Sequence, residues 1–443
     1  MTDLRERVLT LIPGVLDDLT TLVGIPSISS MPEHHPDVQR TADAVARFAT
    51  DLGCPDVEIV SEGGQPAVIA RFPAPEGAPT VCLYAHHDVQ PTGDKELWTS
   101  DPFQVTRRNG RLYGRGVVDD KAGIAVHLAA LRAFDGKPPV GVTLFVEGEE
   151  EVGSPSLARI MERHADKLAA DVYVICDSAN WQVGTPAFTT ALRGLADVVV
   201  TVDTLDHALH SGQYGGAAPD ALTTLVRLLS TLHDADGNVA VPGLDSEPPF
   251  ALEYPEDRLR AETGLLDGVE FMGTGPLADR LWGRPSITVL AIDCTRVADA
   301  SNTLAPSAHA KVSMRLAPSQ DAAAALAALK QHLLDQAPFG ARVTFGAEES
   351  AGGSLVALEG AVADAAQAAY SDAWGTDAVE VGQGGSIPLV GLFQSAFPDA
   401  HVLVTGVVDP DSRMHGIDES FDLADFTNAC VAEADLLERL GRS

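Results

Sequence analysis

Apolar residues are grouped at both ends of the chain into short, nearly continuous runs. The four clearest runs are PTVCLYAHH (79–87), VGVTLFVEG (140–148), ADVYVICD (170–177) and AHVLVTGVV (400–408). Runs of this kind are typical of parallel strands that are covered on both faces. Between them, apolar residues at helical spacing predict helices over 121–134 and 154–169. This alternation predicts an α/β domain with a mostly parallel sheet.

The middle of the chain has a different order of elements. The pattern predicts, in sequence, a strand, a helix, two strands, a helix and a strand over 194–204, 220–233, 286–294, 308–318, 321–336 and 341–350. This β-α-β-β-α-β order is that of a ferredoxin-like α+β unit. We therefore expect a discontinuous α/β domain of residues 1–188 and 351–443, interrupted by an α+β domain of residues 189–350. Residues 234–285, rich in Pro, Gly and acidic side chains, are expected to be irregular.

Charge and cysteine content narrow the possible environments and partners. The 443 residues include 30 Lys and Arg against 63 Asp and Glu, which gives a formal net charge of −33. Such a surface repels nucleic acids and anionic membranes. No run of about 18 apolar residues occurs, and the N-terminus lacks the pattern of a signal peptide. The five cysteines are scattered without a C-x-x-C pair, which suits a reducing compartment. We expect a cytoplasmic protein with no nucleic-acid or membrane partner.

Residues that can bind metals follow each of the four predicted parallel strands. They are His86 with Asp88, the acidic stretch 147–154, Asp177, and His415 within 409–420; Asp119 and Asp120 precede a predicted helix. Sites in open α/β sheets form beyond the carboxyl ends of the strands. Because several buried carboxylates are tolerated only with compensating cations, we expect a metal centre. Imidazole with carboxylate suits zinc, or less specifically manganese or cobalt, and the number of ligands suggests two bridged ions.

The stretch HHD at 86–88 allows the two adjacent histidines to be told apart. Side chains alternate along a strand, so His86 and Asp88 leave it on the same side. Asp88 can then accept a hydrogen bond from the second imidazole nitrogen of His86 and fix the ring. His87 points the opposite way and is expected not to bind metal.

Six motifs resemble, in order, those of a family of di-zinc metallohydrolases. The family includes acetylornithine deacetylase, succinyl-diaminopimelate desuccinylase, carboxypeptidase G and carnosinase-like dipeptidases, and the last are the most similar. The motifs are YAHHDVQP (84–91), LYGRGVVDDKAG (112–123), EGEEEVGS (147–154), LHSGQYGG (209–216), KVSMRLAP (311–318) and GGSIP (384–388).

The resemblance implies a catalytic site in the α/β domain. One metal would be held by His86, Asp119 and Asp177, and the other by Asp119, Glu151 and His415, with Asp119 bridging. The peptide bond between Asp119 and Asp120 is expected to be cis. Glu150 would be the general base, which takes a proton from water and delivers it to the leaving amine.

The resemblance also implies that residues 189–350 form a lid domain, through which two copies of the chain associate as a homodimer. His210 would stabilise the tetrahedral oxyanion in a neighbouring subunit's site, and Asn302 would have a related role. Arg315 would face the terminal carboxylate of the substrate, for which its guanidinium fork is suited. Ser386, with the backbone of Gly384 and Gly385, would help to hold that carboxylate.

These observations together predict a di-zinc metallopeptidase that cleaves dipeptides or short peptides. An N-acyl-amino-acid deacylase with the same site is the alternative. A protein that binds metal or peptide without catalysis is a third possibility, disfavoured by the presence of Glu150.

Overall fold

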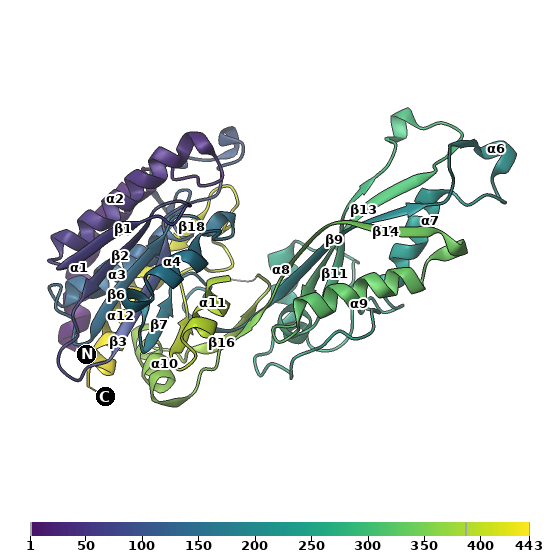
Figure 1. The fold of residues 1–443 in the computed structure, drawn as a ribbon. Helices are drawn as coiled ribbons and strands as arrows, with labels where there is room; N and C mark the ends of the chain where they lie inside the picture. The colour runs from purple at the N-terminus through teal and green to yellow at the C-terminus, as the bar shows by residue number, and fades with distance from the viewer. Residues whose placement is uncertain (1, 386–387, 443) are drawn as a thin grey trace. The chain divides into compact units, whose positions relative to one another are not determined.

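The computed structural model describes residues 2–385 and 388–442, which divide into two compact units (Figure 1). Unit 1 comprises Met1–Thr190, Val356–Val381 and Pro388–Ser443, and unit 2 comprises Ala191–Leu355 and Gly382–Ile387. The predicted Ser386 lies outside the described residues.

A six-stranded sheet in the order β1-β2-β6-β3-β7-β17 is the centre of unit 1. The four strands β6, β3, β7 and β17 run parallel to one another, whereas β2 pairs antiparallel with both β6 and β1. The bounds are β1 (Asp56–Val60), β2 (Ala67–Phe72), β3 (Thr80–His86), β6 (Gly141–Glu147), β7 (Val172–Ile175) and β17 (His401–Val404). The predicted mostly parallel α/β sheet is therefore confirmed.

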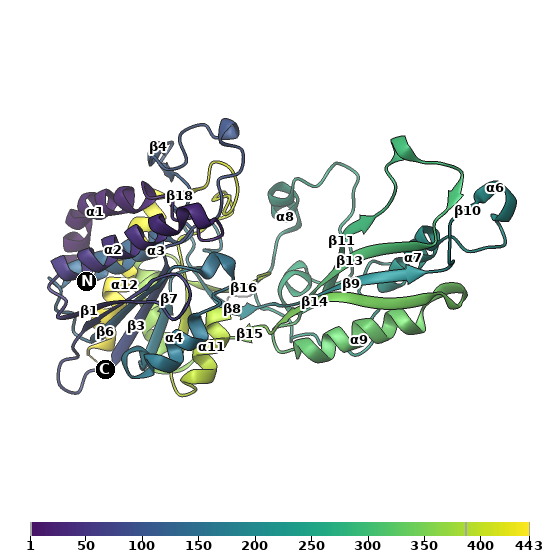
Figure 2. The same cartoon turned by 45° about the horizontal axis from the view of Figure 1, so that its top comes forward.

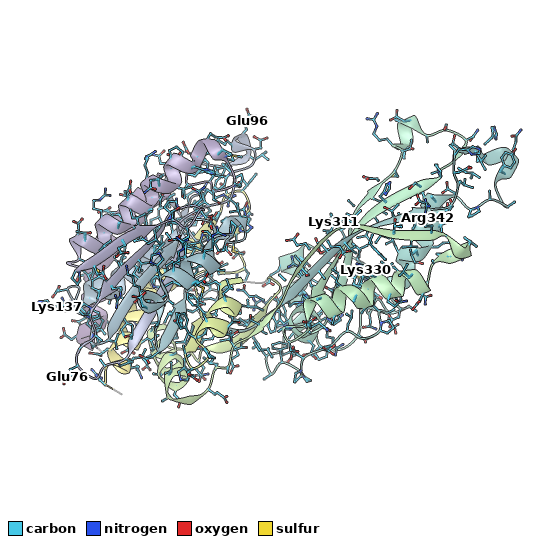
Figure 3. All side chains as sticks on the ribbon, viewed as in Figure 1. Glu76, Glu96, Lys137, Lys311, Lys330 and Arg342 are labelled. Atoms are coloured by element: carbon cyan, nitrogen blue, oxygen red, sulfur yellow. The ribbon has the colours of Figure 1, made fainter. Side chains whose placement is uncertain are left out.

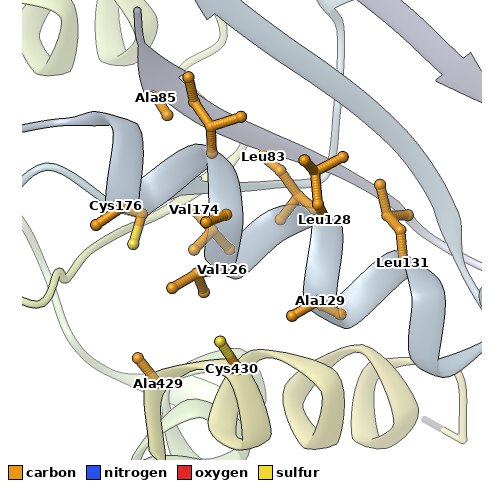
Figure 4. Packing of buried hydrophobic residues seen from close by; sticks show 14 of the residues in the cluster. Leu83, Ala85, Val126, Leu128, Ala129, Leu131, Val174, Cys176, Ala429 and Cys430 are labelled. Atoms are coloured by element: carbon orange, nitrogen blue, oxygen red, sulfur yellow. The ribbon is translucent and has the colours of Figure 1, made fainter. Parts of the chain in front are cut away.

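Helices cover both faces of this sheet because its apolar runs present side chains to both. Leu83 and Ala85 of β3 belong to the core formed with α3 and α12, as Figure 4 shows. Tyr173 of β7 instead stacks on Phe393 of α11, with ring centroids 4.3 Å apart. The helices are α1 (Thr2–Val23), α2 (His35–Asp51), α3 (Lys121–Ala133), α4 (Leu157–Arg163), α5 (Ala165–Leu168), α10 (Gly360–Trp374), α11 (Pro388–Ala396) and α12 (Leu423–Leu440).

The predicted single helix over 154–169 is wrong, since α4 and α5 are separate. His164 leaves the helical backbone conformation between them, with φ −117°, and its ring pairs with Glu62 at 3.2 Å.

Small sheets complete the strand structure. The sheet β18-β5-β4 sets the segment after His415 beside residues 111–113. A second three-stranded sheet has the order β15-β8-β16. The bounds are β4 (Thr106–Arg108), β5 (Arg111–Tyr113), β18 (Ser420–Asp422), β8 (Ala187–Leu192), β15 (Ser354–Leu355) and β16 (Val379–Gln383).

Unit 2 has a four-stranded antiparallel sheet with helices on one face (Figure 2). The sheet order is β11-β13-β9-β14, and α7 and α9 pack on alternate residues of β9 such as Val198 and Val200. This is the predicted ferredoxin-like arrangement. The bounds are β9 (Gly194–Asp203), α7 (Ala221–Leu229), β11 (Ser286–Asp293), β13 (Ser307–Leu316), α9 (Ala322–Asp335) and β14 (Arg342–Ala351).

Two further regions of unit 2 lie outside that core. The stretch 234–285, expected to be irregular, contains helix α8 (Glu256–Thr263) as well as a turn of π-helix (Asp279–Gly283). Strand β10 (Leu209–His210) pairs with β12 (Thr303–Leu304). Helix α6 (Ser211–Tyr214) follows β10 directly in the chain. Among the described helices, none combines the length and the apolar character needed to cross a bilayer.

Candidate metal centre

The metal-binding side chains predicted in unit 1 converge beyond the carboxyl ends of the parallel strands. They form two neighbouring groups, in each of which the possible ligand atoms lie within 4.8 Å of one another. The first cluster consists of His86, Asp120 and Asp177, and the second cluster of Asp119, Glu151 and His415.

The first cluster is fixed by two neighbouring strands. His86 ends β3 and is fully buried, and Asp177 follows β7. The Nε2 atom of His86 lies 3.9 Å from Oδ1 of Asp177 and 3.1 Å from Oδ1 of Asp119. Asp119 therefore faces this imidazole even though it belongs to the second cluster.

The second cluster is built on loops. The Nε2 atom of His415 lies 2.9 Å from Oδ2 of Asp119 and 3.2 Å from Oε2 of Glu151. The two oxygens of Asp119 thus face two different imidazoles, one on each side, which is the geometry that a bridging carboxylate needs. The bond between Asp119 and Asp120 is cis, as predicted.

Burial sets the protonation of these carboxyl groups. It raises the pKa of Asp177 well above its usual range and the pKa of Glu150 to about 7. Burial also acts to raise the pKa of Asp119, but hydrogen bonds with His415 and His86 outweigh it and leave this pKa low. Several carboxyl groups lie close together in this largely buried site. The carboxylate and imidazole groups of the two clusters therefore suit the binding of divalent cations.

The two histidines of HHD differ as the alternation predicted. The Nδ1 atom of His86 lies 3.4 Å from Oδ1 of Asp88. His87 belongs to neither cluster, and its Nε2 atom lies 2.8 Å from the carbonyl oxygen of Pro66. Asp88 also accepts hydrogen bonds from the backbone N–H groups of Glu150 (3.2 Å) and Glu151 (3.1 Å). It therefore ties the end of β3 to the acidic loop.

The three consecutive glutamates 149–151 have separate surroundings. Glu149 is buried and accepts hydrogen bonds from the backbone N–H groups of Gln65 (2.9 Å) and Ser156 (2.6 Å), so it anchors the loop. Glu151 belongs to the second cluster, and Glu150 lies between the two in sequence, close enough to the clusters for their charges to act on its pKa.

Two residues of this centre were not assigned a role from the sequence, although both stand in its motifs. Asp120 belongs to the first cluster, while its carboxylate accepts the backbone N–H groups of His86 and Gly123, each at 3.2 Å. Gln90 holds Glu151 through its backbone N–H at 3.0 Å and its side-chain amide at 2.7 Å. Both stand inside the quoted motifs, beside residues that were chosen.

The remaining predicted residues belong to unit 2. His210 pairs with Thr303 in the β10–β12 ladder, and the carbonyl of Asn302 accepts the backbone N–H of Ser211 at 2.9 Å, so these two residues are neighbours. Arg315 lies on β13, half-buried, between Leu195 and Ser286 of the adjacent strands. Gly384 and Gly385 are exposed.

Two clusters of possible metal ligands that share the carboxylate of Asp119 at the carboxyl edge of an α/β sheet, with a glutamate beside them, are typical of di-metal hydrolases. Residues 82–439 match Peptidase family M20/M25/M40, and the chain belongs to this family.

Named relatives agree with this assignment. The chain is 34% identical over 450 residues, covering 100% of it and 97% of the relative, to a cysteinylglycine-S-conjugate dipeptidase of Corynebacterium striatum. It is 29% identical to a Beta-Ala-His dipeptidase of Rattus norvegicus over 83% of this chain and 80% of the relative. The crystal structure of human carnosine dipeptidase 1 has the same fold, with a TM-score of 0.81 at 24% identity over 99% of this chain and 98% of that one. The predicted family, fold class and metallopeptidase activity are confirmed.

Proposed function

We propose that this metallopeptidase hydrolyses the amide bond of dipeptides or short peptides with two divalent ions, of which Zn²⁺ is the first choice and Mn²⁺ or Co²⁺ the alternatives. The observation that carries the proposal is Asp119, whose two oxygens lie 3.1 Å and 2.9 Å from the imidazoles of His86 and His415. The dipeptidase relatives described above support peptides as the substrate class.

The ligand roles follow from the two clusters. His86 and Asp177 would hold one ion, Glu151 and His415 the other, and Asp119 would bridge them. Asp120 would be a further oxygen donor to the first ion. The ions would supply Lewis acidity at the scissile carbonyl and make a nearby water more acidic.

Glu150 is the proposed general base. Burial raises its pKa to about 7, which is close to the value at which a carboxylate both accepts a proton from water and returns it to a leaving amine. Its backbone N–H donates to Asp88, and Asp88 also faces His86, so one carboxylate holds the base and a metal ligand in fixed relation.

His210 is suited to donate a hydrogen bond to an oxyanion. Its Nδ1 atom accepts the backbone N–H of Gly212 at 3.0 Å. The ring proton of the neutral imidazole is then on Nε2, which is left as a donor. Asn302 lies beside it in the same unit, and its side-chain amide is a second donor.

Arg315 is the proposed ligand of the substrate carboxylate, together with Ser386, Gly384 and Gly385. Within the described ranges, no carboxylate or other acceptor pairs with the guanidinium of Arg315. Its charge acts on neighbouring Arg193, whose pKa falls to about 10 chiefly through burial. A cationic pair without an acidic partner favours a bound anion.

Two wider proposals concern assembly and location. Edge strand β11 exposes Val289, Leu290 and Ile292, with exposed fractions of 36%, 55% and 37%, which supports a homodimer formed through the lid. Five free cysteines, four of them buried, support a reducing, cytoplasmic location.

Chelation and a Glu150→Gln variant test the catalytic proposal together. We expect the metal-free wild type to lose dipeptide hydrolysis and to regain it when Zn²⁺ is restored. E150Q should retain the metal content of wild type while kcat falls by about 10²–10⁴-fold. Metal analysis and initial rates on a dipeptide panel measure both effects.

A parallel panel of N-acetyl amino acids separates the proposal from the deacylase alternative. Faster hydrolysis of the acetylated substrates would favour the deacylase. Tight peptide binding without cleavage by the metal-loaded wild type would favour the non-catalytic alternative, and full activity of the chelated protein would refute the metal mechanism.

A further inference from the structure

We propose that the buried ion pair between Arg115 and Glu419 positions the loops that carry Asp119 and His415, reaches that of Glu151 through the neighbouring segment 90–91, and so sets the affinity of the second ion more strongly than that of the first. We call this pair the loop clamp. The proposal rests on the two-ion site described above and assigns to two residues outside the ligand set a role in assembling it.

The two clusters differ in what holds their ligands. Of the first cluster, His86 ends β3 and Asp177 closely follows β7, two strands that pair with each other in register, and only Asp120 lies in a loop. Asp119, Glu151 and His415 of the second cluster lie in segments outside β-ladders. Those segments need other contacts to bring them together.

Glu419 fixes the segment that carries Asp119. Its side chain is fully buried, and its carboxylate accepts the backbone N–H groups of Gly116 (3.1 Å), Val118 (3.1 Å) and Asp119 itself (3.3 Å). A carboxylate that receives three backbone donors determines the path of the chain through residues 116–119.

Arg115 fixes the segment that carries His415. One guanidinium nitrogen donates to Glu419 at 2.6 Å, and the other donates to the carbonyl oxygens of His415 and Gly416, each at 3.1 Å. The residue is only 2% exposed, so these contacts are made away from water. The planar guanidinium can serve several acceptors at once, which a lysine ammonium in the same place would not reproduce.

The third loop is reached through Pro91. The same guanidinium nitrogen of Arg115 donates to the carbonyl oxygen of Pro91 at 3.2 Å. The preceding residue, Gln90, holds both carboxylate oxygens of Glu151, at 3.0 Å and 2.7 Å. The loop clamp therefore contacts the segments of Asp119 and His415 directly and is linked to Glu151 through Pro91 and Gln90.

The loop clamp adds no net charge to a region that is already acidic. Its cation and anion neutralise each other at 2.6 Å, so it organises the loops without competing with a divalent ion for the ligand carboxylates. Residues that orient metal ligands in this way typically change metal affinity by about 10–100-fold when they are removed.

Site-resolved zinc affinity tests the proposal on the full-length protein. The variants are Arg115→Met, Glu419→Gln and Gln90→Leu, and Arg132→Met is the matched control, because Arg132 pairs with Asp18 across α3 and α1, away from the ligand loops. Zn²⁺ binding is measured by competition with a chromophoric chelator, and the metal-to-protein ratio is measured after desalting. Circular dichroism establishes that each variant is folded.

In the three variants we expect the affinity of one ion to fall by about 10–100-fold, that of the other, which shares the loop of Asp119, to fall less, and the metal-to-protein ratio to fall from two to one. R132M should match wild type. Added Zn²⁺ should restore activity to E419Q and Q90L, an effect that general damage to the fold would not give. If R115M fails to fold, E419Q and Q90L decide the outcome.

Equal weakening of both ions, or unchanged binding in the folded variants, would overturn the loop clamp while leaving the two-ion site intact. A wild-type ratio below two would refute the two-ion function itself, and the loop clamp with it.

Discussion

The three consecutive glutamates 149–151 acquire different roles because each makes different contacts in the folded loop. Glu149 is held by the N–H groups of Gln65 and Ser156, whereas Glu151 is held by Gln90 and faces His415. Glu150 is left with a raised pKa. The three carboxyl groups are chemically identical in the unfolded chain, so their division of roles is a property of the folded loop.

Buried Lys121 gives a prediction about pH and stability. Its ammonium donates to the carbonyl oxygens of Leu22 and Ile25, each at 2.9 Å, and burial lowers its pKa to about 7, although the Glu419 and Asp88 carboxylates act in the opposite direction. Between pH 7 and 9 the unfolded chain keeps this proton while the folded chain releases it. The free energy of unfolding should therefore rise with pH in this window relative to Lys121→Met.

Urea unfolding of the metal-free proteins at pH 7 and pH 9 measures that difference. Lys137→Met, at an exposed position, is the control and should follow wild type at both pH values. Parallel pH curves for wild type and K121M would contradict the prediction.

At the residue scale, the sequence predicted most of the side chains that form the two clusters but not the residues that support them. Alternation along one strand was enough to separate His86 from His87. Asp120 was missed as a cluster member because two adjacent aspartates look alike in sequence. Arg115 and Glu419 were missed because their contact joins positions 304 residues apart, which no local pattern reveals.

At the scale of elements, the boundaries in unit 1 are set by caps and by the ends of apolar runs. Helix α12 is capped by Asp422, whose carboxylate accepts the backbone N–H groups of Ala424 (2.9 Å) and Asp425 (3.1 Å). This helix packs against α3, which is itself capped by Asp120. Capping therefore contributes both to the fold and to the position of the metal centre.

Removing the cap of α12 should lower stability by a measurable amount. We expect Asp422→Ala to reduce the free energy of unfolding by about 1 kcal/mol, because two backbone donors lose their acceptor. Asp422→Asn keeps a side-chain oxygen and should lose much less. Urea unfolding of the three proteins measures this, and equal losses in D422A and D422N would contradict a capping role.

Apolar periodicity predicted the four parallel strands of the six-stranded sheet and the four strands of the antiparallel sheet, but not β1 and β2. The break between α4 and α5 and the helix α8 within 234–285 were both missed. In each case the local pattern is weak, so the backbone conformation depends on contacts such as that between His164 and Glu62.

At the scale of the whole molecule, the chain is two compact units with different tasks. Unit 1 holds the metal centre, and unit 2 holds His210, Asn302 and Arg315. Figure 3 draws the side chains of both units and labels charged residues of both signs, such as Glu76 and Lys311. The formal net charge of −33 favours binding of divalent cations.

A charge on the exposed edge strand should prevent the proposed dimer. Leu290→Arg places a cation on β11, where a second copy would have to pack or pair, and edge charges block such association. We expect a shift from dimer to monomer in light scattering, with the metal content of unit 1 unchanged. Leu266→Arg, at a position 75% exposed outside that strand, is the control and should remain dimeric. A dimeric L290R protein would place the interface elsewhere.

The sequence by itself determined the four parallel strands of the larger sheet, the β-α-β-β-α-β order of the second core, and the residue types that gather at the strand ends. These properties depend on periodicity and on short motifs, which are local. Only the tertiary structure decided which carboxylate faces which imidazole, which glutamate anchors its loop, and which buried ion pair gathers the loops of the second cluster. Those outcomes depend on contacts between distant segments, whose geometry exists only once the sheet has brought its strand ends to one edge.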